Sequence, residues 1–161
     1  MIKSFYIIGF MGTGKSSLKQ YLAKSNQVID LDEYFEADVG MSIPVYFSTY
    51  GEEAFRRRES ELLRQVQAEY VITGGGIVEQ DGNIEWMKSR GVIIALDLPF
   101  EGCWERIRHS DRPLVKKGEA NARALYERRK PLYEQAHVII DASLEPLTIA
   151  QTIQRLKEEE K

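Results

Sequence analysis

Eight residues near the start of the chain, Gly9–Ser16, constrain the fold more than any other stretch. They read Gly-Phe-Met-Gly-Thr-Gly-Lys-Ser and match the G-x-x-x-x-G-K-S pattern of a phosphate-binding P-loop. The flanks fit this motif. The apolar run 4–8 has the length of a strand and ends on Gly9, and residues 16–25 place apolar side chains at helical spacing. The sequence therefore predicts a strand, a glycine-rich turn and a helix in succession.

This arrangement indicates a site for a nucleoside triphosphate. Such a turn directs successive backbone N–H groups at phosphate oxygens, and the start of the following helix adds positive potential. We expect Lys15 to reach the β- and γ-phosphates and the Ser16 hydroxyl to bind Mg²⁺. The predicted ATP-binding residues of the loop are Gly12, Thr13, Gly14, Lys15, Ser16 and Ser17.

Length and composition indicate one globular domain over residues 1–161. The chain is 43% hydrophobic and 29% charged, which is ordinary for such a domain. Its formal net charge of −3 argues against a dedicated nucleic-acid binder. Cys103 is the single cysteine and cannot form an internal disulfide, and no apolar run reaches transmembrane length. We expect a cytoplasmic monomer that binds neither nucleic acid nor membrane.

Apolar runs of strand length recur along the chain and alternate with segments of helical periodicity. The runs are residues 4–8, 27–29, 70–73, 92–96 and 138–140. This alternation predicts an α/β fold, with a parallel sheet covered by helices on both faces. Ligands of such sheets bind at the carboxyl ends of the strands, so the residues that follow each strand are the candidates for chemistry.

Two carboxylates, Asp30 and Asp32, follow the second predicted strand. On the ligand edge of the sheet, one could organise Mg²⁺ through water while the other contacts a substrate hydroxyl. The alternative is that Asp32 only caps a helix over 33–39. Proximity to a P-loop favours the functional interpretation.

Arginines and glycines supply two further candidates. A long helix predicted to begin near Gly51 and to end at about Ala68 carries Arg56, Arg57 and Arg58, which cannot all share one face. We expect at least two of them on a solvated face with partners such as Glu52 for Arg56, while one could project into the cleft. The run Gly74–Gly76 follows a strand directly and would let backbone approach a ligand closely.

Asp97 ends the fourth apolar run and matches a generic Walker B pattern. We favour instead a capping or turn role before a helix over 100–107. The polar segment from about 109 to 122 is long for a loop in a compact domain and predicts a mobile lid. Arg112, Lys116 and Lys117 would bring its positive charge over ATP.

Together these motifs resemble the shikimate kinases over almost the whole chain. The resemblance rests on the P-loop, on Asp30-x-Asp32, on the series from Gly40 to Ile43 and from Gly51 to Arg56 with Glu59 following, on Gly74–Gly76, on Arg112-Pro-Leu and on Arg129-x-Pro-Leu-Tyr133. It implies a P-loop fold with sheet order 2-3-1-4-5 and ATP-dependent phosphorylation of the 3-hydroxyl of shikimate. It also makes the strand before Gly74 the Walker B equivalent, which disfavours Asp97 further.

The resemblance assigns roles to matching positions. Asp32 would orient or accept the proton of the 3-hydroxyl, and Arg56 and Arg129 would hold the carboxylate, with Gly74, Gly75 and Gly76 beside the substrate. Arg112 would stabilise the transferring phosphoryl group, and Asp30 would position Mg²⁺ through water. The chain departs from some relatives in a short lid and in lacking an arginine at 142–145. The alternatives are a gluconate or nucleoside monophosphate kinase, or a non-catalytic or GTP-switch module, although the guanine-reading N-K-x-D is absent.

Overall fold

A computed structural model describes residues 3–23 and 27–160. Its centre is a five-stranded parallel sheet in the order β2-β3-β1-β4-β5. The strands are β1 (Ser4–Ile8), β2 (Val28–Asp30), β3 (Tyr70–Ile72), β4 (Gly91–Asp97) and β5 (Val138–Asp141). Each lies within two residues of its predicted run, and the α/β class and the sheet order are both confirmed.

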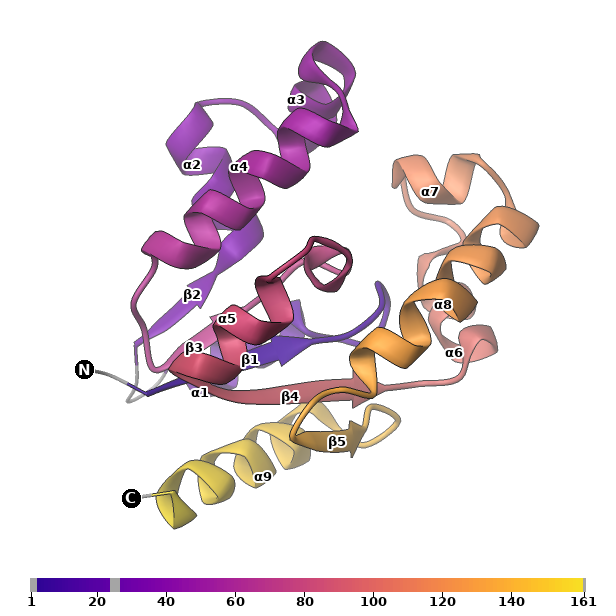
Figure 1. Ribbon diagram of the computed structural model, residues 1–161. Helices are drawn as coiled ribbons and strands as arrows, with labels where there is room; N and C mark the ends of the chain where they lie inside the picture. Colours follow the sequence, from indigo (N-terminus) through magenta and orange to yellow (C-terminus); the bar gives the residue numbers. More distant parts are fainter. Residues whose placement is uncertain (1–2, 24–26, 161) are drawn as a thin grey trace.

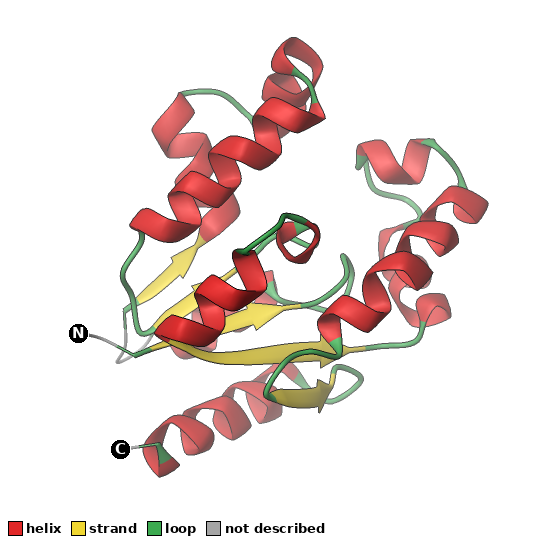
Figure 2. Ribbon diagram, viewed as in Figure 1, coloured by secondary structure: helices red, strands yellow, loops and turns green. Residues whose placement is uncertain are grey.

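Helices cover both faces of the sheet. Helix α9 runs along one face, while α5 and the end of α8 lie on the other (Figures 1 and 2). The helical segments are η1 (Ser16–Leu18), α1 (Lys19–Leu22), α2 (Leu31–Val39), α3 (Ile43–Tyr50), α4 (Glu52–Gln65), η2 (Ile77–Glu79), α5 (Asn83–Arg90), α6 (Phe100–Ile107), α7 (Pro113–Lys116), α8 (Glu119–Tyr133) and α9 (Pro146–Glu159). None of those in the described ranges is long and apolar enough to span a membrane.

The core lies along the central strands. All five residues of β1 are buried, because β3 and β4 flank this strand and helices cover it. The register pairs Ile7 with Ile72 of β3 and with Ile94 of β4. Burial on both faces explains why the strands appear in the sequence as continuous apolar runs.

Helices α2, α3 and α4 stand together beside the sheet (Figure 1). Aromatic side chains join them, with ring centroids 4.9 Å apart for Phe35 and Phe55 and 5.2 Å apart for Phe47 and Phe55. This packing fixes the start of α4, and with it Arg56, relative to the end of β2.

Several predicted boundaries differ from the structure. The helix expected over 16–25 is a 3-10 turn continued by α1 to Leu22, and its expected end lies outside the described residues. The lid segment between α6 and α8 covers 108–118 rather than 109–122, because α8 begins directly after Gly118, whose φ is +98°. Within this segment, α7 lies beyond the carboxyl ends of the strands (Figure 1).

Candidate active site

The predicted P-loop forms between β1 and η1. Gly12 and Gly14 adopt φ values of 87° and 94°, in the region where a side chain is strained. Lys15 is only 8% exposed, and its Nζ donates to the carbonyl oxygens of Gly9 at 2.5 Å and Phe10 at 3.1 Å. Burial lowers the Lys15 pKa to about 8, although the nearby Asp32 carboxylate opposes this shift. Among the described residues, the hydrogen-bond partners of this buried ammonium are two carbonyl oxygens of the loop.

A cavity of about 450 Å³ opens above this loop. It brings together the loop, the ends of β2 and β3, and the lid. The predicted site residues that line it are Gly12, Thr13, Gly14, Lys15, Ser16, Ser17, Asp30, Asp32, Gly74, Gly75 and Arg112. Three predicted site residues do not line the cavity itself: Arg56, Gly76 and Arg129. The two arginines lie beside the glycine run Gly74–Gly76, whose first two residues do line the cavity.

Asp30 and Asp32 have different local roles. Asp30 caps α2, since its Oδ1 accepts N–H groups from Asp32 at 3.0 Å and Glu33 at 3.3 Å. The predicted alternative that Asp32 caps this helix is wrong, because β2 ends at Asp30 and the helix begins earlier than expected. Desolvation, reinforced by the Asp30 charge, raises the Asp32 pKa, although Lys15, Arg56 and Arg112 all act to lower it.

The glycine run Gly74–Gly76 leaves room for the site side chains. A Cβ on Gly74 would lie 3.0 Å from Asp32 Oδ1, and one on Gly75 would lie 3.2 Å from Arg129 Nη1. A Cβ on Gly76 would collide with the Arg56 guanidinium. The absence of side chains thus lets two acids, Asp32 and Glu59, and two arginines converge on one turn of backbone.

The three consecutive arginines diverge, as predicted. Arg57 points to solvent beside Glu53, and Arg58 pairs with Asp38 of α2 and with Glu61. Arg56 is the one that turns toward the site, and its Nη1 donates to Glu59 Oε1 at 2.8 Å. The expected Glu52–Arg56 pair does not form, because the Arg56 guanidinium pairs with the buried carboxylate of Glu59 instead.

Glu59 was not predicted as a site residue. Its side chain is 2% exposed, and its Oε2 has no hydrogen-bond partner among the described residues. Burial raises the Glu59 pKa, while Arg56 acts to lower it. Its position three residues after Arg56 is the sequence signal that points to this pairing.

Arg106 of α6 is a second residue that sequence reasoning missed. Its guanidinium donates to the carbonyl oxygens of Gly12 at 3.0 Å and Ala142 at 3.4 Å. It lines the cavity with Ala142, Leu144 and Pro146 from the segment after β5. Residues 142–145 lack the arginine that some relatives have there. In this chain Arg106 places a cation at the same end of the cavity.

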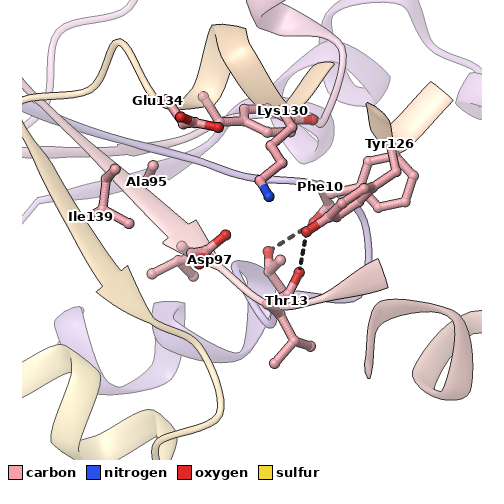
Figure 3. A pocket seen from close by; sticks show the side chains of 11 residues that line it. Phe10, Thr13, Ala95, Asp97, Tyr126, Lys130, Glu134 and Ile139 are labelled. Atoms are coloured by element: carbon pink, nitrogen blue, oxygen red, sulfur yellow. Dashed lines mark hydrogen bonds between the residues drawn. The ribbon is translucent and has the colours of Figure 1, made fainter. Parts of the chain in front are cut away.

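Asp97 belongs to a different place. It lines a second cavity, of about 230 Å³, together with Lys130, Glu134 and Ile139 (Figure 3). Thr13 lies at the border of this second cavity, and its hydroxyl donates to the Phe10 carbonyl oxygen. Of the predicted capping or turn role of Asp97, the capping part is wrong, because Pro99 occupies the N-cap of α6 and Asp97 is the last residue of β4. The Walker B interpretation also fails, because Asp97 does not line the cavity that holds Ser16.

A P-loop beside a cluster of two carboxylates, Asp32 and Glu59, and two arginines defines the class of the protein as a P-loop kinase for a small molecule. A family model described as shikimate kinase matches residues 11–157. The chain belongs to the shikimate kinase family, as the relatives below also show.

Similar proteins share this family across nearly their full length. A shikimate kinase of Bacillus cereus (strain AH187) is 39% identical over 163 residues, covering 98% of both chains. A structure of shikimate kinase from Acinetobacter baumannii in complex with shikimate is 33% identical, with a TM-score of 0.89 over 100% of this chain and 96% of that one. A deoxyadenosine kinase from M. mycoides, at 16% identity and a TM-score of 0.62 over 98% of this chain and 100% of that one, shares the fold alone.

Proposed function

We propose that this member of the shikimate kinase family binds ATP in the P-loop cavity and shikimate at the glycine run. The activity is ATP-dependent phosphorylation of the shikimate 3-hydroxyl, which gives shikimate 3-phosphate and ADP in aromatic amino acid biosynthesis. The observation that carries the assignment of residues is the position of Asp32. Its carboxylate faces the same cavity as Lys15, and a Cβ on the neighbouring Gly74 would touch it.

The part of the site that binds ATP neutralises charge and contributes little covalent chemistry. In the free protein the Lys15 ammonium is held by two carbonyl oxygens of its own loop. Phosphate oxygens are stronger partners for that ammonium, since the hydrogen bonds are then charge-assisted at both ends. Gly12–Ser17 supply N–H groups to the phosphates, and Arg106 lies at the end of the cavity where the rest of the nucleotide extends.

The oxygen donors beside Lys15 fit Mg²⁺. The Ser16 hydroxyl and the Asp30 and Asp32 carboxylates line one cavity, and hard oxygen ligands are those that Mg²⁺ prefers. We assign Ser16 as direct ligand and Asp30 as the residue that acts through water. When bound, Mg²⁺ neutralises charge on the β- and γ-phosphates.

The part of the site beside Gly74–Gly76 binds and orients shikimate. The planar guanidinium groups of Arg56 and Arg129 match a carboxylate in geometry as well as charge. With the acid held there, Asp32 orients the 3-hydroxyl toward the γ-phosphate and accepts its proton. Arg112 closes from the lid and stabilises the phosphoryl group in transfer.

We further propose that the protein works as a monomer in the cytoplasm, without nucleic-acid or membrane partners. The net charge of −3 argues against a nucleic-acid partner. Light scattering after size exclusion measures the oligomeric state, and a stable dimer would contradict this part of the proposal.

A coupled ADP-release assay tests the function, with shikimate, gluconate and AMP run in parallel. We expect turnover with shikimate only. Arg56 and Arg129 favour a carboxylate over the phosphate of AMP, and membership of the shikimate kinase family favours shikimate over gluconate, which also carries a carboxylate. ³¹P NMR of the product then identifies the phosphorylated hydroxyl. Turnover with AMP or gluconate in place of shikimate would contradict the proposal and assign the arginines to another anion.

A further inference from the structure

Glu79 does not line the cavity, and neither the P-loop nor the proposed shikimate site at Gly74–Gly76 accounts for it. It is the last residue of η2, the short turn that directly follows Gly76. Its Oε2 accepts a hydrogen bond from Arg129 Nε at 2.8 Å, and its Oε1 accepts one from Arg128 Nε at 2.7 Å. The two arginines are unlike, since the Arg129 side chain is 5% exposed and that of Arg128 is 65% exposed.

The turn that carries Glu79 is anchored in the protein. Ile77 and Val78 are buried, and Asn83 Nδ2 donates to the Ile77 carbonyl oxygen at 2.9 Å. The Glu79 backbone N–H donates to the Gly76 carbonyl oxygen at 3.1 Å. The carboxylate is therefore held at a fixed place relative to the glycine run.

The contact with Glu79 determines which nitrogens of the Arg129 guanidinium are left to bind a substrate carboxylate. Its Nε is engaged by Glu79, and its Nη1 lies 3.2 Å from the Cβ position of Gly75. Tyr133, one turn further along α8, donates its hydroxyl to the Gly75 carbonyl oxygen at 2.6 Å and ties the helix to the same turn. The guanidinium is thus held at Nε by Glu79, and its Nη1 lies beside the glycine run.

The ionisation of Glu79 agrees with this geometry. Partial burial alone would raise the Glu79 pKa, but hydrogen bonds from Arg128 and Arg129 outweigh it and hold the pKa below its ordinary value. Glu79 is an acceptor for Arg129 throughout the neutral range.

We propose that Glu79 is a positioning residue for the acid substrate: it fixes Arg129 through Nε so that the remaining guanidinium nitrogens face the substrate carboxylate. The inference rests on the proposed role of Arg129. Glu79 itself does not touch the acid, so its effect falls on binding of that substrate and not on phosphoryl transfer.

The test compares Glu79→Ala with Glu79→Gln. Loss of the hydrogen bond between Arg129 and a charged carboxylate costs about 10- to 100-fold, so we expect Glu79→Ala to raise the KM for shikimate by about that factor. The kcat and the KM for ATP should stay within about twofold, because the P-loop is unaffected. Glu79→Gln should recover most of the loss, since an amide oxygen still accepts from Nε. Arg129→Ala sets the upper limit of the effect.

Glu101→Ala is the matched control. Glu101 of α6 pairs at 3.1 Å with Arg123 of α8, the helix that also carries Arg129. Both side chains of this control pair are exposed, and neither is assigned to the ATP site or the shikimate site. This control should leave both KM values unchanged. Thermal unfolding of each variant checks that the fold is intact.

Other outcomes overturn the inference. An unchanged KM for shikimate in Glu79→Ala, an equal rise of both KM values, or a Glu79→Gln variant as weak as Glu79→Ala would each contradict the positioning role. Failure of the unmodified chain to use shikimate would contradict the proposed function instead. Titration of shikimate by calorimetry provides a readout of Arg129 independent of turnover.

Discussion

At the scale of the residue, Asp32 is the group on which the chemistry depends most directly. It faces the cavity of Lys15 and Ser16, and a Cβ on Gly74 would lie 3.0 Å from its Oδ1. We expect Asp32→Asn to lower kcat about 10²–10⁴-fold, the range for loss of a general base. The amide keeps the shape and can still contact a hydroxyl, so the KM for shikimate should change little. Steady-state assays of ADP release measure both constants, and a loss below tenfold would leave Asp32 an orienting role only.

Lys15 predicts a pH dependence on the alkaline side. Its pKa is lowered by burial to about 8, so the free protein loses this charge at a lower pH than an ordinary lysine does. Because kcat/KM reports groups of the free enzyme, kcat/KM for ATP should fall as pH rises through about 8. The corresponding fall in kcat should come at higher pH, because bound phosphates favour the charged amine.

A pH series of initial rates from pH 6 to 10 checks this expectation. Lys15→Met has nearly the same length and no titrating group, so any residual activity of that variant should show no such fall. A wild-type profile of kcat/KM for ATP that stays flat to pH 10 would contradict the assignment.

At the scale of the element, α2 shows that one residue can serve the fold and the site together. Asp30 ends β2, caps α2 through its Oδ1 and lines the nucleotide cavity. Asp30→Ala should lower the free energy of unfolding by about 0.5–2 kcal/mol through loss of the cap. Asp30→Ser should be more stable than Asp30→Ala, since a serine hydroxyl also caps. Both should raise the Mg²⁺ concentration needed for half-maximal activity.

Urea unfolding and Mg²⁺ titrations of activity separate the two roles of Asp30. If the serine and alanine variants were equally unstable, the cap would not matter to the fold. If the Mg²⁺ requirement stayed that of the unmodified chain, Asp30 would have no part in the metal site.

The same element shows where sequence reasoning reaches its limit. The Asp30-Leu31-Asp32 pattern indicated both functions, yet it did not say which carboxylate caps the helix. That choice depends on where β2 stops pairing, and β2 pairs with β3 as far as Asp30. Glu59 and Glu79 were missed for a related reason. For Glu79, a single sequence does not show that η2 meets Arg129 of α8. For Glu59, the spacing to Arg56 is local, but the sequence does not show that the pair is buried beside the glycine run.

At the scale of the whole molecule, strand order decides burial. The five apolar runs were evident in the sequence, and their order came from the resemblance to a family rather than from the runs themselves. Ile94 and Ile139 both lie in such runs. In the structure Ile94 of β4 is 0% exposed, whereas Ile139 of the outer strand β5 is 50% exposed. Strand order and the face on which the side chain lies, both long-range properties, separate two residues that are locally alike, since Ile140 on the other face of β5 is 6% exposed.

This difference predicts unequal costs for the same substitution. Ile94→Ala leaves a cavity between helices and central strands and should lower the free energy of unfolding by about 2–5 kcal/mol. Ile139→Ala removes a side chain that already contacts solvent at the rim of the second cavity and should cost under about 1 kcal/mol (Figure 3). Urea unfolding followed by circular dichroism measures both. If Ile94→Ala does not fold, the valine variants repeat the comparison. Ile94→Val should lower the free energy of unfolding by about 0.5–1.5 kcal/mol and Ile139→Val by about zero. Equal costs at the two positions would contradict the placement of β4 inside the sheet and β5 at its edge.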